Sequence, residues 1–279
     1  MRTALFPLLA LAGCAALNRA EPADTAVRHV NRPPAAHDDG QLLVVTYNVH
    51  METASRIARG LSGPWLRRAD VIMLQEIESH DREHLSRAGQ LAARLGMSYA
   101  YAPGYGLRGG GSHGVAILSR WPLGDLELIE LPREHVVFNS ARRVALGVTV
   151  AYPGRAVRVY NVHLDNRINP SDRRRQLAPV LAAAAERADL PVIVAGDMNT
   201  SPFCWIGHVV PIPCGRQGDR LEELARERGF DLPARGSGPT SPWLGMRLDA
   251  LYARGIAARR VGVDRRVRVS DHLPLWALF

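Results

Sequence analysis

The sequence predicts an α/β protein, because short apolar runs of strand length alternate with amphipathic segments of helix length. The runs, such as residues 192–195, are rich in β-branched side chains, which is typical of strands buried on both faces. Several of them end in a carboxylate, a carboxamide or a histidine. The chain has 279 residues, 47% hydrophobic and 22% charged, so one large domain with a full core is expected.

The first 14 residues have the pattern of an export signal. Met1 and Arg2 precede a short apolar run that ends in Leu-Ala-Gly-Cys at residues 11–14. This ending resembles the lipobox of bacterial lipoproteins, which implies that Cys14 becomes the lipidated first residue of the mature chain. Because Ala15 is not the aspartate that retains such proteins on the inner membrane, the resemblance implies an outer-membrane anchor facing the periplasm. The alternative is an ordinary secretory signal with an incidental cysteine.

Residues 15–40 are polar, rich in proline and alanine, and without periodicity, so we expect a flexible tether. As a coil the tether would span only about 28 Å, which would keep the folded body near the bilayer. The body itself is expected over residues 41–279 as one catalytic domain.

The formal net charge is +8, and all 35 basic residues are arginines. A basic surface favours polyanions such as nucleic acid or anionic lipid head groups. Arginine-biased codon usage explains the same composition without any ligand, so charge alone does not choose a substrate.

The first two predicted strands each release polar side chains at the end. The strand at 41–47 leads to Asn48 and His50, and the strand at 70–74 leads to Gln75 and Glu76. A carboxylate after an apolar run suits magnesium, which prefers oxygen ligands. A solvated charge at a strand end is the alternative interpretation of Glu76. Helical character is expected between the two strands, over residues 57–68.

An amphipathic helix is expected at 82–95, stopped by Gly96. The glycine-rich segment 104–114 is expected to be a flexible hairpin or rim loop, because no Gly-Lys-Ser/Thr pattern follows it and a strand comes next. Residues 136–150 and 156–160 are predicted to pair as strands around the turn at 152–154, and the second leads to His163 and Asp165. A histidine there can donate a proton to a phosphate oxygen, or it can be a structural hydrogen-bonder.

After a helix at 173–188, the strand at 192–195 ends in Gly-Asp-Met-Asn, which holds Asp197 and Asn199 on one face. These side chains suit work on a water and a phosphate oxygen, although a plain turn is the alternative. In the loop 203–218, Cys204 and Cys214 are expected to form a disulfide in an exported protein. A helix at 221–229, a strand at 246–252 carrying Asp249, the pair Asp271-His272 and a strand at 275–279 complete the chain.

The order of these motifs is more specific than any one of them. The chain carries, in sequence, TYNVH, QE, GVAILSR, NVHLD, GDMNT, RLDALY and SDHLPL. This succession, over residues 41–279, resembles the endonuclease/exonuclease/phosphatase superfamily, which includes deoxyribonuclease I, abasic-site endonucleases, sphingomyelinases and inositol-phosphate 5-phosphatases. The resemblance implies a four-layer α/β sandwich, in which two mixed β-sheets pack face to face with helices outside.

The resemblance also implies where a metal and a phosphate would bind. Glu76 and Asn48 match ligands of a magnesium ion, for which manganese is the alternative, and Asp271 matches an acidic residue near that metal. Arg143 matches an arginine that contacts phosphate, and Arg142 beside it leaves open which of the two faces the site.

The remaining matches imply hydrolysis by direct attack of water on a phosphoester. His272 matches the histidine beside the scissile phosphate, and Asp249 the carboxylate that orients it. Asp197 matches the residue that orients or deprotonates the water, and Asn199 would steady a phosphate oxygen or the nucleophile. His163 matches the histidine of the deoxyribonuclease I and sphingomyelinase branches.

The predicted function is a magnesium-dependent phosphoester hydrolase, anchored by lipid in the cell envelope and monomeric. A nuclease-like phosphodiesterase acting on DNA or RNA is the first hypothesis, favoured by the basic composition and by His163. Hydrolysis of a phospholipid, sphingomyelin-like or inositol phosphoester is the second, because a short tether keeps the site near head groups; another small phosphoester stays open. A catalytically inactive binding module on the same fold is the alternative of another class.

Overall fold

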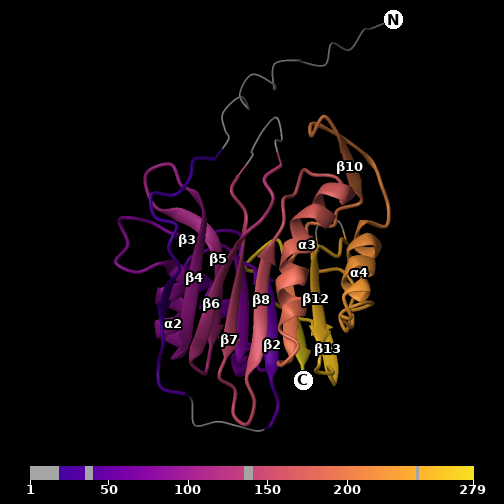
Figure 1. Ribbon diagram of the computed structural model, residues 1–279. Helices are drawn as coiled ribbons and strands as arrows, with labels where there is room; N and C mark the ends of the chain where they lie inside the picture. The colour runs from indigo at the N-terminus through magenta and orange to yellow at the C-terminus, as the bar shows by residue number, and fades with distance from the viewer. Residues whose placement is uncertain (1–18, 35–39, 135–140, 243–244) are drawn as a thin grey trace, which may run out of the picture.

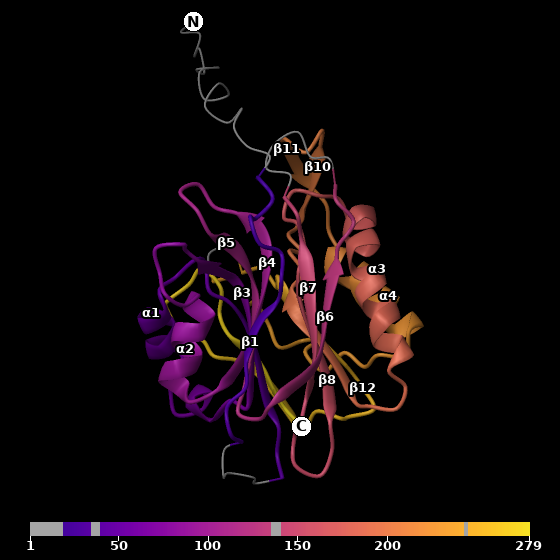
Figure 2. The same ribbon diagram turned by 60° about the vertical axis from the view of Figure 1, so that its left-hand side comes forward.

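The computed structural model describes residues 19–34, 40–134, 141–242 and 245–279. Two large mixed sheets lie face to face, and helices cover the outer face of each (Figures 1 and 2). The predicted four-layer α/β sandwich is therefore confirmed. Cys14 lies outside the described residues. Within them, no helix combines the length and the apolar character needed to cross a bilayer.

One sheet has seven strands, of which only β2 and β3 run parallel to each other. Its strands, in spatial order, are β1 (Arg28–Val30), β4 (Ser98–Gly106), β5 (Ser112–Ser119), β3 (Val71–Ser79), β2 (Leu43–Asn48), β14 (Leu275–Leu278) and β13 (Arg260–Val263). The predicted strands at 41–47, 70–74 and 275–279 are confirmed as β2, β3 and β14.

The other sheet has five strands, and only β8 and β9 are parallel. In spatial order they are β12 (Asp249–Arg254), β9 (Val192–Asp197), β8 (Val157–His163), β7 (Val144–Val150) and β6 (Leu123–Glu130). The predicted hairpin is confirmed, with Val150 opposite Val157 across the turn. Its first strand begins at Val144, whereas part of its predicted start, residues 136–140, lies outside the described residues.

Each sheet is covered by two α-helices. α1 (Ala54–Gly60) and α2 (Arg87–Leu95) pack on the seven-stranded sheet, and α3 (Pro170–Glu186) and α4 (Gln217–Glu227) on the five-stranded sheet. α2 is shorter than predicted because the Ser86 hydroxyl accepts from the Gly89 N–H and so begins the helix there; it ends at the left-handed Gly96, as expected. The helical stretch expected at 57–68 is divided into α1 and a 3₁₀ turn, Leu66–Arg68.

The core between the sheets is made of the apolar runs that predicted the strands. Val44 and Met73 from one sheet and Val159 and Ile193 from the other are fully buried in a single cluster. Burying one such side chain contributes about 1.5–3 kcal/mol. The cores under the helices, which are separate clusters, use the alternate residues of the same strands.

The expected tether at 15–40 is wrong for its described part. β1 pairs with β4, and the Gly106 N–H donates to the Ala20 carbonyl at 2.7 Å. The Asn31 side chain bonds both backbone groups of Leu123, at 2.8 and 2.9 Å. Three paired residues are too few to show a strand period in the sequence, and Val27, which packs against the inter-sheet core, is isolated among polar neighbours.

Other connections are more ordered than the sequence predicted. The glycine-rich segment 104–114 forms the end of the hairpin of β4 and β5, as one of the two expectations had it, and only residues 107–111 are a loop. The loop 203–218 contains a two-stranded hairpin, β10 (Phe203–Ile206) and β11 (Val210–Pro213). The expected disulfide between Cys204 and Cys214 is present. Strands β6 and β13 were not predicted.

Candidate active site

Polar side chains from both sheets meet at the end of the sandwich where β2, β8 and β9 stop. The sheets are joined just beneath by two buried carboxamides. Gln75 Nε2 donates to Asn161 Oδ1 at 2.6 Å, and Asn161 Nδ2 donates to the carbonyls of Leu74 and Ala116, each at 2.8 Å. This link fixes the spacing between β3 and β8, and neither carboxamide had been assigned a role from sequence.

Asp197 lies at the centre of the group. Its carboxylate accepts hydrogen bonds from Asn48 Nδ2 at 2.9 Å and from the backbone N–H of Asn199 at 2.8 Å. Gly196, just before it, must be glycine, because its φ is +151° and a Cβ would lie 1.9 Å from the Val162 carbonyl oxygen. Asp197 ends β9, and Asn199, with a φ of +51°, turns back after the strand so that its N–H reaches the Asp197 carboxylate. The strand end and the turn are therefore both present.

Burial raises the pKa of the Asp197 carboxyl to about 7, against the opposing effect of His272 and with the help of Asp249. A carboxyl with this pKa exchanges its proton near neutral pH.

His272 and Asp249 form a buried pair on one side of Asp197. His272 Nδ1 donates to Asp249 Oδ2 at 2.8 Å, and His272 Nε2 lies 3.7 Å from Asp197 Oδ2. The hydroxyl of Thr240 accepts from the Asp249 N–H at 3.1 Å. Burial alone would lower the pKa of His272, but the two carboxylates outweigh it and raise that pKa to about 10. The imidazole is therefore positively charged at neutral pH.

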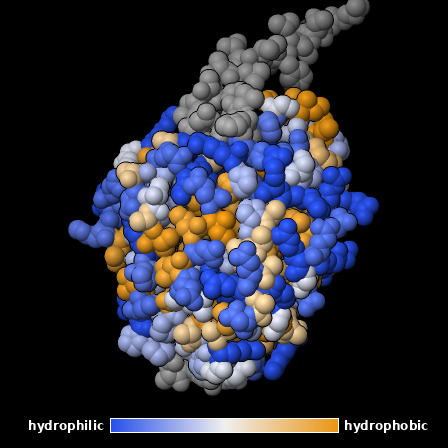
Figure 3. All heavy atoms as spheres, viewed as in Figure 1, coloured by the Kyte–Doolittle hydropathy of each residue, from blue (hydrophilic) through white to orange (hydrophobic). Residues whose placement is uncertain are grey.

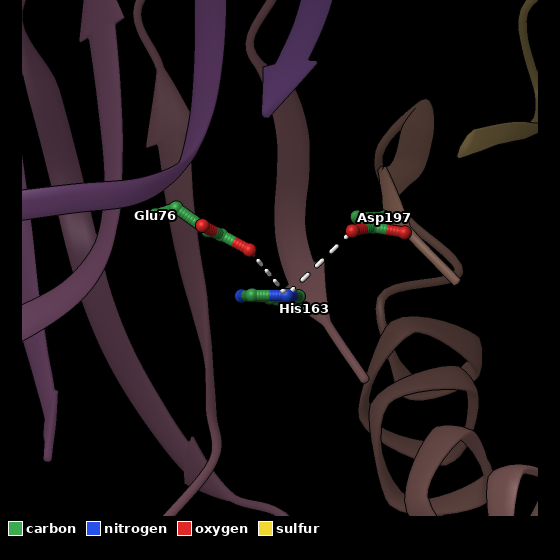
Figure 4. A group of neighbouring side chains, drawn as sticks. All are labelled: Glu76, His163 and Asp197. Atoms are coloured by element: carbon green, nitrogen blue, oxygen red, sulfur yellow. Dashed lines mark ion pairs between the residues drawn. The ribbon is translucent and has the colours of Figure 1, made fainter. Parts of the chain in front are cut away.

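His163 lies on the other side, with its Nε2 3.8 Å from Glu76 Oε1 and 3.6 Å from Asp197 Oδ2 (Figure 4). Arg143 Nη1 lies 3.2 Å from Nδ1, and because a guanidinium only donates, Nδ1 must accept. The hydrogen of the neutral ring is therefore on Nε2 and points toward the carboxylates. Burial, Arg143 and His113 lower the pKa of His163 well below its usual value, so the ring is neutral.

Of the two adjacent arginines, Arg143 faces the site. Its Nε donates to Asp165 Oδ1 at 2.6 Å, while its Nη1 reaches His163. Arg142 points instead to Glu130 Oε2, at 2.9 Å, and to the Pro103 carbonyl, at 2.8 Å. The sequence left this choice open.

The chemistry of the donors fits a hard divalent cation. Two groups of side chains have donor atoms close enough to share an ion: Glu76, His163 and Asp197, and Asp197, Asp249 and His272. Protonated His272 cannot ligate a metal, and Arg143 keeps the hydrogen of His163 on Nε2. The remaining members of the two groups are the carboxylates of Glu76, Asp197 and Asp249, and Asp249 is paired with His272. Carboxylate oxygens are the ligands that magnesium takes.

The two other predicted metal ligands, Asn48 and Asp271, are not oriented to share an ion with Glu76. Asn48 presents Nδ2 to Glu76 Oε1 at 3.2 Å, while its Oδ1 accepts from the His50 N–H, so ligation through oxygen requires the carboxamide to turn over. Asp271 stands outside both donor groups, half exposed, with Oδ1 3.9 Å from His50 Nδ1. Glu76 is not at a strand end as expected, but at a bulge within β3, where its φ is +54°.

Sequence reasoning missed the residues that support the predicted ones. The Tyr105 ring stacks on His113 with centroids 4.4 Å apart, and the guanidinium carbon of Arg143 lies 5.8 Å from the Tyr105 centroid. Gln176 Nε2 donates to Asp165 Oδ2 at 2.9 Å and so holds the partner of Arg143. Of these supporting residues, only Asp165 could have been found from the sequence, because it lies in the NVHLD block with the predicted site residue His163.

A family model described as "Endonuclease/Exonuclease/phosphatase family" matches residues 45–272. The chain has no significant match among curated proteins. Among solved structures, an endonuclease/exonuclease/phosphatase from Beutenbergia cavernae is 25% identical, with a TM-score of 0.67, over 85% of this chain and 71% of that one. A family protein from Leptotrichia buccalis is 17% identical, with a TM-score of 0.64, over 85% and 98%. The 3′ phosphatase NExo from Neisseria, bound to a product DNA hairpin, is 19% identical, with a TM-score of 0.60, over 85% and 98%.

Proposed function

The chain belongs to the endonuclease/exonuclease/phosphatase family, and from this premise we propose that it is a magnesium-dependent hydrolase of nucleic-acid phosphodiesters. The observation that carries the proposal is the position of Asp197 between two histidine Nε2 atoms, at 3.6 and 3.7 Å. One histidine is charged and the other is a neutral donor. A phosphoryl group beside Asp197 would thus meet a base, a cation and a hydrogen-bond donor.

Each group has a task in the attack of water on phosphorus. Asp197 accepts the proton of the water as the new P–O bond forms. Protonated His272, held by Asp249, stabilises the negative charge that develops on a phosphoryl oxygen, and the His163 Nε2–H orients another oxygen. Asn199 Nδ2 donates to the Leu164 carbonyl at 2.8 Å and to Asp197 Oδ2 at 3.3 Å, so Asn199 steadies the group that receives the proton of the water. The bond to the leaving oxygen breaks in the same displacement, so no covalent enzyme intermediate is needed.

We assign the metal to the oxygen donors around Glu76, with Asn48 and Asp271 as further ligands once their side chains turn. A bound magnesium ion supplies positive charge to the phosphoryl oxygens. Magnesium is proposed over softer metals because the free donors are carboxylate and carboxamide oxygens. Manganese, which also takes oxygen ligands, should substitute.

Nucleic acid is favoured by a basic hollow of about 520 Å³ whose lining ends at Val269, the residue before Ser270, whose hydroxyl donates to the Asn48 carbonyl. Four arginines line it, from α1 and from the loop that leads to Ser270 and His272: Arg56, Arg59, Arg266 and Arg268. A row of arginines next to a phosphoester site suits a second phosphate of a strand. The Neisseria relative, which was solved with a DNA hairpin, gives further support.

A phospholipid headgroup is the second candidate substrate. It is favoured by the aliphatic side chains that the β10–β11 hairpin exposes at the same end of the molecule, among them Ile206 and Val210, 60% and 53% exposed. An apolar patch beside a hydrolytic site is unusual for an enzyme that meets only water-soluble substrates.

The deciding experiment offers plasmid DNA and a phospholipid panel side by side, with magnesium and with chelator. The full chain carrying Cys14→Ser is used, because truncation at residue 41 would remove β1 from its sheet. Magnesium-dependent nicking with intact lipids supports the nuclease, and lipid cleavage with intact plasmid supports the second candidate. Activity that survives chelation contradicts the proposed metal dependence. If neither plasmid nor phospholipid is hydrolysed, both proposed substrate classes are wrong and a binding module is favoured.

We further propose that Cys14 is lipidated and that the protein is held in the outer membrane, facing the periplasm. The support is the sequence alone, an apolar export signal that ends in Leu-Ala-Gly-Cys before Ala15. Cys14→Ser should move the protein from the membrane fraction to the soluble fraction and abolish incorporation of labelled fatty acid. A variant that still incorporates the label contradicts the proposal.

A further inference from the structure

The hairpin β10–β11 exposes a cluster of aliphatic side chains. Seven large apolar side chains are exposed among the described residues, and four of them lie on this hairpin: Ile206, Val209, Val210 and Ile212, with 60%, 38%, 53% and 39% exposed. Figure 3 shows apolar spheres at the upper right, where Figure 1 places β10. Scattered exposed aliphatics are ordinary, but a cluster on one projecting element indicates a contact surface.

The hairpin is held rigidly, so it cannot fold back to bury these side chains. The Cys204–Cys214 disulfide joins its two strands. The Asn169 side chain, at the start of α3, bonds both backbone groups of Trp205, at 2.8 and 3.1 Å. Gln217 Nε2, at the start of α4, donates to the Phe203 carbonyl at 2.6 Å. The exposed cluster is therefore a fixed feature of the folded protein.

The hairpin lies at the same end of the molecule as the candidate active site. β10 begins at Phe203, four residues after Asn199, and its base is tied to the loop that follows His163, since Asn169 lies in that loop. A surface that contacts the aliphatic tip would also face the opening of the site.

The beginning of the described chain lies at this end too, as both ribbon views show (Figures 1 and 2). The guanidinium carbon of Arg19 lies 5.2 Å from the Tyr105 ring centroid, and the Ala20 carbonyl accepts from Gly106. Cys14 is only five residues before Arg19. Five extended residues reach about 18 Å at most, so a lipid on Cys14 would keep this end of the body within that distance of the bilayer.

Basic residues flank the apolar tip. Arg167 is exposed and lies over the Trp205 ring, with 5.8 Å from its guanidinium carbon to the centroid. The Arg216 side chain, after the second strand, is 85% exposed. Aliphatic side chains at a tip with arginines around its base match the apolar interior and the anionic head groups of a membrane surface.

We propose that the β10–β11 hairpin binds the surface of an anionic phospholipid bilayer and holds the site end of the protein against it. This role goes beyond hydrolysis, since it does not depend on which phosphoester is cleaved. The short distance from Cys14 is one of its supports and rests on the proposed lipidation, but the apolar tip and its arginines do not.

The test uses the full chain with Cys14→Ser, so that no covalent lipid contributes to binding. The protein is sedimented with phosphatidylcholine vesicles and with vesicles that also contain phosphatidylglycerol. We expect binding to the anionic vesicles that falls at least tenfold in Ile206→Ser/Val210→Ser, because two aliphatic side chains no longer enter the interface. The control, Val30→Ser/Leu85→Ser, removes two side chains elsewhere that are 47% and 48% exposed and should bind within twofold of the parent.

Two results would overturn the proposal. One is a parent chain that stays in the supernatant with both kinds of vesicle, and the other is a hairpin variant that binds as well as the control. Sedimentation equilibrium without lipid measures the oligomeric state of the parent and of the hairpin variant. A dimeric parent and a monomeric hairpin variant would mean that the hairpin binds a second copy of the chain and not a membrane. Unchanged thermal unfolding of both variants shows that a loss of binding is not a loss of fold, and because hydrolysis is not measured, failure of the proposed activity leaves the result intact.

Discussion

His163 and His272 approach the same Asp197 carboxylate from opposite sides of the site, yet one ring is neutral and the other is charged. Both are buried, which lowers the pKa of each. His272 has Asp249 on its far nitrogen, whereas His163 has Arg143 there. Asp249 and Asp197 outweigh the effect of burial on the pKa of His272, whereas Arg143 adds to the effect of burial on the pKa of His163.

Because their charge states differ, the two histidines can have different functions in the site. A charged ring stabilises negative charge, and a neutral ring whose hydrogen points at the reacting group acts as an oriented donor. The same residue type thus supplies a cation and a dipole because the carboxylate Asp249 and the guanidinium Arg143 select different states. Substitutions that exchange or remove these partners test the division directly.

The largest effect is expected from removal of the charged histidine. His272→Ala should lower kcat by at least a thousandfold, because the positive charge beside the phosphoryl group is lost. His84→Ala, at an exposed histidine in the segment between β3 and α2, is the control and should leave kcat unchanged. Residual activity within tenfold of the parent, on whichever phosphoester the protein cleaves, would refute the role of His272.

A smaller loss is expected at the neutral histidine, and an amide should partly replace it. His163→Gln should cost about ten- to a hundredfold in kcat, because the amide still donates a hydrogen bond, whereas His272→Gln should be as inactive as His272→Ala. The comparison is made with purified variants at saturating magnesium. Equal losses in the two glutamine variants would mean that the two rings do not differ in charge.

Removal of Arg143 should make the two histidines more alike. In Arg143→Gln the nearby positive charge is gone, so the pKa of His163 should rise toward its ordinary value, while that of His272 should not move. Titration of the histidine ring signals by NMR in the metal-free protein measures both. Gln176, which also holds Asp165, should keep that carboxylate in place. An unmoved His163 would show that burial alone lowers its pKa.

The smallest effect is expected on the free energy of unfolding, and its dependence on pH should have opposite signs for His272 and His163. The folded pKa of His272, about 10, is above the ordinary value near 6.5, so its stabilisation is full below about pH 6.5 and is lost as the pH rises through 10. The folded pKa of His163 is depressed, so its contribution is present above about pH 6.5 and is lost at lower pH.

Urea unfolding with chelator between pH 5 and pH 10 measures both contributions. His272→Gln should flatten the alkaline limb of the stability curve, and His163→Gln the acidic limb. A substitution that flattens the limb assigned to the other histidine would reverse the assignment of charges.

The parts of the fold that the sequence predicted are those with a strong local period. Buried β-branched runs such as residues 192–195 identify strands whatever they pack against, and the polar residues that follow them fall at one edge of a sheet. For this reason the local pattern alone is enough to place Asp197 and Asn199 together. The site is therefore largely visible in the sequence, although the roles of its residues stay predictions.

The parts that the sequence missed depend on distant partners. β1 is a strand only because β4 offers a free edge, and the β10–β11 hairpin is anchored by Asn169 and the disulfide, not by its own pattern. Arg142 and Arg143 could not be distinguished, because both precede β7 and their directions are set by the distant partners Glu130 and Asp165. The bulge at Glu76 is likewise a property of the β3–β5 pair.

The buried hydrogen bond from Gln75 to Asn161 affects whether hydrolytic activity or secondary structure is lost first on heating. Asn48 and Glu76 belong to the seven-stranded sheet, and His163 and Asp197 to the five-stranded one, so the site exists only while the sheets keep their relative position. A displacement of about 1 Å between reacting groups can cost a hundredfold in rate. On mild heating, hydrolysis should therefore decline before circular dichroism detects any loss of strands, which makes turnover the earliest indicator that the two halves of the sandwich have begun to separate.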